Sequence, residues 1–110
     1  MTISYPDFEK VDMRVGRVID VQDFPEARKP AYKLTIDFGP EIGTKKSSAQ
    51  ITQLYTKETL INRLVVCTIN FPPKQIGPFM SECLTMGAAN EQGAIELLSI
   101  QDVPLGSRIF

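Results

Sequence analysis

The most constraining feature of the sequence is a strict alternation of apolar and polar side chains in YKLTIDF, residues 32–38. Successive side chains of an extended strand point to opposite faces, so the apolar ones share a single face. These apolar residues are Tyr32, Leu34, Ile36 and Phe38. The pattern predicts a strand with one face in a hydrophobic core and the other in solvent.

Weaker patterns predict further strands over residues 11–21, 45–51, 64–71, 81–87 and 94–100. In the first of these segments the odd positions are mostly apolar, which predicts that they face the core. Gly16 lies in the middle of that strand, where we expect a bend or bulge that lets it curl. Thr56 is suited to cap a short helix over residues 56–64, with Leu60 and Leu64 on one face.

Five or six short strands, with one short helix between the third and the fourth, favour a closed sheet over an open one. The fold class predicted is all-β: a five-stranded Greek-key barrel of the OB-fold type, with a short helix and extra terminal segments. A chain of 110 residues has room for one core, so we expect a single domain over residues 1–110.

Composition narrows the possible functions. The chain contains no histidine, which removes the commonest general base and the commonest metal ligand. The sequence shows no nucleotide-binding motif and no metal-ligand cluster either, so we expect a protein that is not an enzyme and needs no cofactor or metal. The formal net charge of −1 provides no global positive field to attract a polyanion. Any binding of nucleic acid would therefore depend on a local basic patch.

The start of the chain, MTISYPDFEKVD, lacks a basic stretch followed by an apolar run. The longest apolar window, LVVCTI, is far shorter than the roughly 20 residues of a membrane span. We therefore expect a cytoplasmic protein that does not insert into membranes. Cys67 and Cys83 lie within apolar patterns and are expected to be buried thiols, not parts of a disulfide framework.

The segment NFPPKQIGPFMSECL, residues 70–84, combines three prolines with several large apolar side chains. Two interpretations are open. The segment either folds back to fill the end of the barrel, with Phe71 as the residue expected in the core, or it presents apolar surface to a partner. That partner would be a second copy of the chain or an extended apolar peptide. Ile76, Phe79 and Met80 are the better candidates for such an interface.

Four stretches together resemble a known family: DFEKVDMRVGRV, FPEARKPAYKLTIDFG, KKSSAQIT and NFPPKQIGPFMSECL. They are similar to the CsaA-type secretion chaperones. That group belongs with the tRNA-binding OB domains found at the C-terminus of many methionyl-tRNA synthetases and in the endothelial monocyte-activating polypeptide. The resemblance runs from about Asp7 to the C-terminus. It implies an OB-fold, a homodimer, peptide binding through exposed apolar surface, and a tRNA-binding heritage.

The tRNA-binding relatives use a lysine before the core leucine of the second strand, an arginine entering the third strand, and a serine and a methionine in a short motif. The corresponding positions here hold Lys33, Lys45, Ser81 and Leu84. The third-strand arginine and the motif's methionine are therefore replaced, and the motif's glycine is replaced by Cys83.

Two sets of candidate site residues follow. The candidates for contact with tRNA are Lys33, Lys45, Lys46, Lys74 and Ser81, unless these lysines only solvate the surface. The candidates for peptide binding or dimerisation are Phe71, Ile76, Phe79, Met80 and Leu84. The first functional hypothesis is an ATP-independent chaperone for unfolded or presecretory polypeptides. The alternative is a structure-specific tRNA-binding protein, acting alone or in trans with a synthetase, and one barrel can carry both activities.

Overall fold

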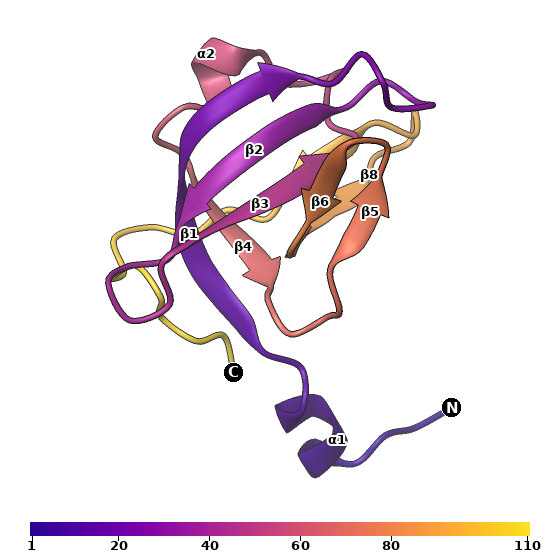
Figure 1. Ribbon diagram of the computed structural model, residues 1–110. Helices are drawn as coiled ribbons and strands as arrows, with labels where there is room; N and C mark the ends of the chain where they lie inside the picture. The colour runs from indigo at the N-terminus through magenta and orange to yellow at the C-terminus, as the bar shows by residue number, and fades with distance from the viewer.

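The fold is an antiparallel five-stranded barrel, seen in a computed structural model that describes residues 1–110 (Figure 1). Its strands are β1 (Met13–Asp23), β2 (Tyr32–Asp37), β3 (Thr44–Ala49), β4 (Leu64–Thr68) and β7 (Leu84–Thr85). They pair in the order β3-β2-β1-β4-β7. The two outermost strands of that order, β3 and β7, contact each other and nearly close the sheet. The all-β OB-fold prediction is confirmed.

The remaining elements are short. They are α1 (Tyr5–Glu9), α2 (Lys57–Leu60), the hairpin β5 (Lys74–Ile76) with β6 (Phe79–Ser81), and the hairpin β8 (Gly87–Ala89) with β9 (Ile95–Leu97). Neither helix is long or apolar enough to cross a membrane. The side chain of Thr56 caps α2 by accepting a hydrogen bond from the backbone N–H of Thr59. The helix is shorter than predicted because Ile61 is already extended and Asn62 has a φ of 67°.

The core lies inside the barrel, as the alternation in β2 predicts. Leu34, Ile36 and Phe38 are buried, whereas Tyr32 lies at the margin of the core and donates a hydrogen bond to the backbone oxygen of Tyr55. Strand β4 is buried on both faces, as its apolar sequence indicates. Val65 and Cys67 of β4 face the barrel interior. Arg108 in the C-terminal segment forms an isolated antiparallel bridge with Arg14 of β1.

Strand β1 differs from the prediction in the face that it turns to the core. A bulge at Ile19 shifts the register between Val18 and Asp20, and Ile19 itself is exposed. Before the bulge, Gly16 and Val18 face the barrel interior. Val15 is fully buried as well, but it lies outside the core cluster of the barrel, and its backbone exchanges hydrogen bonds with the C-terminal segment. The expectation that the odd positions face the core is therefore wrong for this half of β1, and the bulge lies three residues beyond Gly16.

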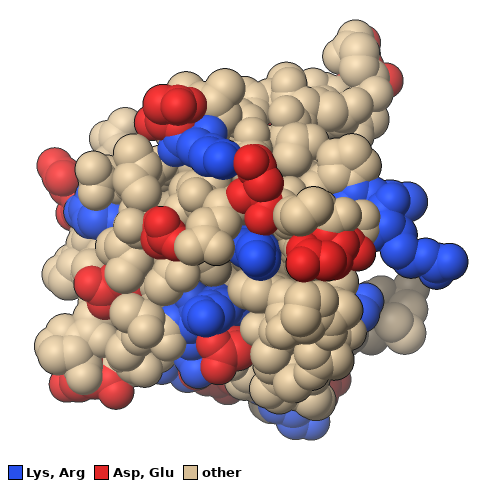
Figure 2. Space-filling model, turned by 45° about the horizontal axis from the view of Figure 1, so that its top comes forward, with Lys and Arg blue, Asp and Glu red and all other residues tan.

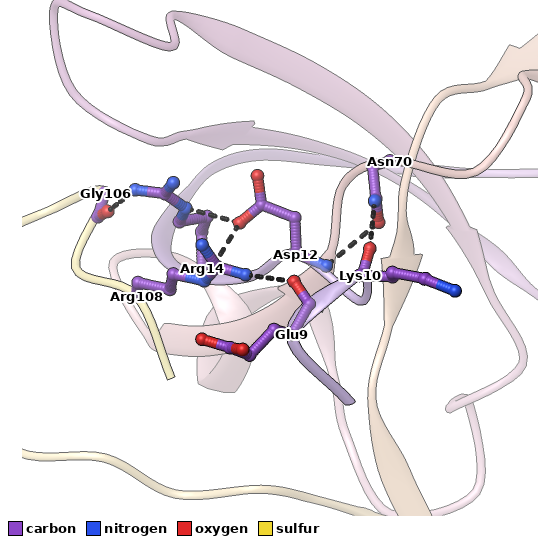
Figure 3. Close-up of polar contacts among 7 residues, drawn as sticks. All are labelled: Glu9, Lys10, Asp12, Arg14, Asn70, Gly106 and Arg108. Carbon is purple, nitrogen blue, oxygen red and sulfur yellow. Dashed lines mark hydrogen bonds and ion pairs between the residues drawn. The ribbon is translucent and has the colours of Figure 1, made fainter. Parts of the chain in front are cut away.

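The two ends of the chain meet beside β1 through a network of polar contacts (Figure 3). The carboxylate of Asp12 lies 2.6 Å from Nε of Arg14 and 3.9 Å from Nε of Arg108. Arg14 also donates to the backbone oxygen of Gly106, and Arg108 donates to that of Glu9. The network therefore joins the segment after α1 to the C-terminal tail.

Asn70 anchors the start of the proline-rich segment to the same network (Figure 3). Its Oδ1 accepts a hydrogen bond from the backbone N–H of Asp12 at 3.0 Å, and its Nδ2 donates to the backbone oxygen of Lys10 at 2.7 Å. This double contact fixes the direction in which the chain leaves β4. The residues that follow are consequently carried toward the surface.

Candidate binding groove

Three adjoining hollows follow the outer edge of β3, with volumes of about 460, 450 and 360 Å³. Ser48 and Gln50 line all three, so we treat the hollows as one groove. The groove is bounded by the loop between β1 and β2 and by the segment between β4 and β7. OB-folds bind oligonucleotides and oligosaccharides between the equivalent loops. The groove is therefore the candidate functional site.

The middle hollow, of about 460 Å³, has a largely apolar wall supplied by the proline-rich segment. This wall consists of Phe71, Pro72, Ile76 and Leu84. Phe71 is 56% exposed and Leu84 is 50% exposed, so neither contributes much to the protein's own core. The expectation that Phe71 lies in the core is wrong. Strand β4 ends at Thr68, and the anchor at Asn70 directs the next side chain outward.

The other two apolar candidates lie elsewhere on the β5–β6 hairpin. The ring of Phe79 packs edge-on against Phe24, with 5.4 Å between the ring centroids, and so holds the hairpin against the loop after β1. Met80 is 43% exposed and lines none of the three hollows. The structure therefore brings Phe71, Ile76 and Leu84 together and leaves Phe79 and Met80 outside the groove.

The lysines proposed for tRNA contact divide between two faces of the sheet. Lys33 is opposite Ser48 in the β2–β3 register, and Lys46 shares that outer face. Lys45 lies opposite the core residue Ile36 and therefore starts from the inner face of β3. Lys74 lines the groove from β5. On the face shown in Figure 2, basic and acidic side chains are interspersed and form no broad field of one sign.

Residues 81–83, just before β7, bond to residues 46–48 of β3, and we call this contact the seam. Ser81 is part of it. The Oγ of Ser81 accepts the backbone N–H of Ser48 at 3.1 Å. Glu82 contacts Lys46 twice: its backbone N–H donates to the oxygen of Lys46, and its Oε1 accepts the N–H of Lys46. Ser47 donates its hydroxyl to the oxygen of Cys83. Sequence reasoning assigned no role to Glu82, because a carboxylate that caps a strand edge carries no pattern.

The two cysteines are free and buried, as expected. Cys83 lines the middle hollow and is 6% exposed, whereas Cys67 is fully buried. The neighbouring thiol of Cys83 raises the pKa of Cys67, and burial raises it further. The Cys67 thiol in turn lowers the pKa of Cys83, which makes Cys83 the more acidic thiol of the pair.

Comparison with known proteins identifies CsaA chaperones among solved structures and methionine–tRNA ligases among curated proteins. The chain matches the CsaA chaperone protein from Picrophilus torridus with a TM-score of 0.94 and 50% identity, over 99% of this chain and 100% of that chain. It matches the chaperone CsaA from Bacillus anthracis strain Ames with a TM-score of 0.93 and 43% identity, over the full length of both chains.

Curated relatives include methionine–tRNA ligases. That of Thermococcus onnurineus is 35% identical over 107 residues, and that of Nanoarchaeum equitans is 37% identical over 107 residues. Each match covers 97% of this chain but only 14% and 13% of the two ligases. The chain therefore spans about one seventh of the length of these relatives.

A family model described as "Putative tRNA binding domain" matches residues 13–108. This match covers β1 to β9 and the C-terminal segment that pairs with β1. Together with the full-length similarity to both CsaA structures, it confirms the resemblance found in the sequence. This chain belongs to the tRNA-binding domain family and, within it, to the CsaA group.

Proposed function

We propose that the protein is an ATP-independent, cytoplasmic chaperone that binds unfolded or presecretory polypeptides in the groove beside β3. The observation that carries the proposal is the apolar middle hollow with Phe71 and Leu84 half exposed at its wall. Large exposed apolar side chains that adjoin one another mark interaction sites on proteins. The names of the two CsaA chaperones, which are similar over the whole chain, support the same function.

The chemistry of the groove suits weak and unselective binding of polypeptides. Covering one large apolar side chain contributes about 1.5–3 kcal/mol, before the costs of association are subtracted. Two or three such side chains provide a grip that holds an unfolded segment and still releases it. Because apolar burial is non-directional, the groove would accept many sequences.

The proposed function is tested by the aggregation of a chemically denatured client diluted into buffer without ATP. We expect light scattering to fall in the presence of the protein, and the effect to persist at high salt, because apolar burial is not screened by ions. A scattering curve that the protein leaves unchanged would contradict the proposal.

We also propose that the protein is a homodimer, as the resemblance implies. Met80 on the β5–β6 hairpin remains a candidate for the dimer interface because it is exposed and lies outside the groove. Sedimentation equilibrium is expected to give about twice the chain mass of 12.3 kDa at micromolar concentration. Met80→Lys should shift this equilibrium toward the monomer, whereas a single species of 12.3 kDa at all concentrations would exclude the dimer.

Binding of tRNA is a second candidate function, which the position of Lys33 and Lys46 on one outer face of the sheet favours. Each phosphate contact on a single strand contributes about −0.7 to the slope of log K against log salt. We therefore expect Lys33→Ala together with Lys46→Ala to weaken binding and to reduce the slope by about 1.4. Filter binding at several salt concentrations measures both quantities.

Lys10→Ala is the matched control for this experiment, since Lys10 lies on the surface beside α1 and pairs with Asp7. It should leave both the affinity and the slope unchanged. If tRNA does not bind even at low ionic strength, tRNA binding is not a function of this chain.

A further inference from the structure

The outer edge of β3 changes from paired to unpaired within the groove. Both backbone groups of Lys46 are bonded to Glu82, and the N–H of Ser48 is bonded to Ser81. Backbone groups of alternate residues point to the same side of a strand, so the C=O of Ser48 and the N–H and C=O of Gln50 face the groove too. Burial supports this continuation, since Ala49 and Ile51 are buried and Gln50 is exposed.

These groups have no partner within the protein. Gln50 takes part in no backbone hydrogen bond outside the regular elements, and its side chain makes none. The C=O of Ser48 points away from β2, because the neighbouring position Lys46 uses both of its groups on the outer side. Ser48 and Gln50 are also the residues that all three hollows share. A short open strand edge therefore lies at the centre of the groove.

The order of donors and acceptors along this edge identifies its partner. An extended polypeptide presents alternating N–H and C=O groups with the spacing of the edge and pairs with it as an additional strand. Every second side chain of such a strand points to one face, where the apolar wall of the middle hollow would receive it. Phosphate oxygens fit the edge less well, because they only accept hydrogen bonds and two of the three free groups are carbonyls. RNA could reach these carbonyls only through its 2′-hydroxyls or its bases.

Charge distinguishes one end of the groove from the other. The hollow of about 450 Å³ contains Arg28, Lys29 and Lys74 against the single acidic residue Glu26. None of these three basic side chains forms a salt bridge within the protein. This end of the groove is therefore complementary to an acidic side chain of the occupant.

We propose that the groove binds an extended polypeptide segment as an added β-strand, hydrogen-bonded to Ser48 and Gln50. Alternate apolar side chains of the segment enter the middle hollow, and an acidic side chain lies at the end formed by Lys29 and Lys74. This inference rests on the proposed polypeptide binding and adds the mode of recognition: main-chain hydrogen bonds provide affinity that does not depend on the client's sequence.

The probe is a capped, fluorescent hexapeptide with four alternating leucine and serine residues followed by two aspartates. In each derivative of this parent peptide one backbone nitrogen is methylated. N-methylation removes a single donor. In an added strand only every second N–H faces β3, and only the C=O groups of Ser48 and Gln50 are free to accept. We therefore expect two derivatives, methylated two positions apart, to lose at least tenfold in affinity and the others to change less than twofold. Hydrogen exchange of the Gln50 amide should slow at least tenfold when the parent peptide binds.

Loss at every position, or at none, would overturn the added strand. If the parent peptide fails to bind while client aggregation is still suppressed, the added strand is again wrong but the proposed chaperone function stands. If neither occurs, both are wrong. Tight binding of a uridine oligonucleotide that displaces the peptide would assign the groove to RNA instead.

Lys74→Glu tests the charged end. This variant should weaken the aspartate peptide about tenfold and favour a peptide that ends in two lysines. Lys57→Glu, on α2 and outside the groove, is the matched control and should change neither affinity. An equal response of both variants would exclude specific recognition of charge.

Discussion

Phe71→Ser combined with Leu84→Ser is expected to abolish the suppression of client aggregation and to leave the fold intact. These side chains form part of the apolar wall of the middle hollow. Full burial of such a side chain contributes about 1.5–3 kcal/mol, and about half of each is still exposed for a client to cover, so their joint loss lowers affinity on the order of 10- to 100-fold. Both are at least half exposed, so their removal leaves no cavity in the core. Light scattering of a denatured client measures the effect.

Leu54→Ser combined with Leu98→Ser is the matched control, because both leucines are exposed and neither lines the groove. This control should retain activity. Equal activity of the two double variants would show that the groove does not bind clients. Phe79→Ser is unsuitable for the same test, because it removes the ring that packs against Phe24 and would disturb the hairpin itself.

Gly16→Val is expected to produce the largest loss of stability of any single change considered. A Cβ at Gly16 would lie 2.5 Å from Cγ2 of Ile36 and 2.8 Å from Cε1 of Phe38. Strand β1 is paired on both sides, to β2 and to β4, so its backbone cannot move away without breaking a ladder. Overpacking of a core costs about 1–3 kcal/mol and occasionally more, and here we expect the upper end.

Equilibrium unfolding in urea measures this loss. Thr35→Val, on the outer face of β2, introduces the same side chain into a strand without a clash and should change stability by less than about 0.5 kcal/mol. A valine at position 16 that costs no more than this control would mean that the barrel interior is not closely packed at Gly16.

The sequence predicts the barrel well wherever one local pattern fixes the face of a strand. The alternation in residues 32–38 identifies three core side chains because β2 has no irregularity. The same rule fails in β1, since a bulge changes the face of every residue on one side of it and Ile19 has no distinctive chemistry. Gly16 suggested the bulge, but the structure requires its small size for a different reason, the packing of Phe38.

The candidate site is less predictable because it depends on closure of the barrel. The apolar character of residues 70–84 indicates a binding surface, but the exposure of Phe71 depends on the distant contacts of Asn70. The opposite faces taken by Lys45 and Lys46 follow from the β2–β3 register. The segment predicted as one strand over 81–87 is interrupted, since Ser81 and Glu82 bond across the seam to β3.

The seam has a consequence for how the protein responds to heat and to proteases. Ser81 and Glu82 form part of the seam and also line the groove. Their side chains accept hydrogen bonds from the backbone of β3, so β3 is joined to this segment mainly through side chains. A bound polypeptide that contacts both β3 and the β5–β6 hairpin would span the seam, where few main-chain hydrogen bonds close the barrel. Occupancy and folding are thereby linked, since a ligand that binds only the native state raises its stability. If a polypeptide binds there as proposed, the ligand-free protein would accordingly be the form that is most readily unfolded by heat or cut by proteases.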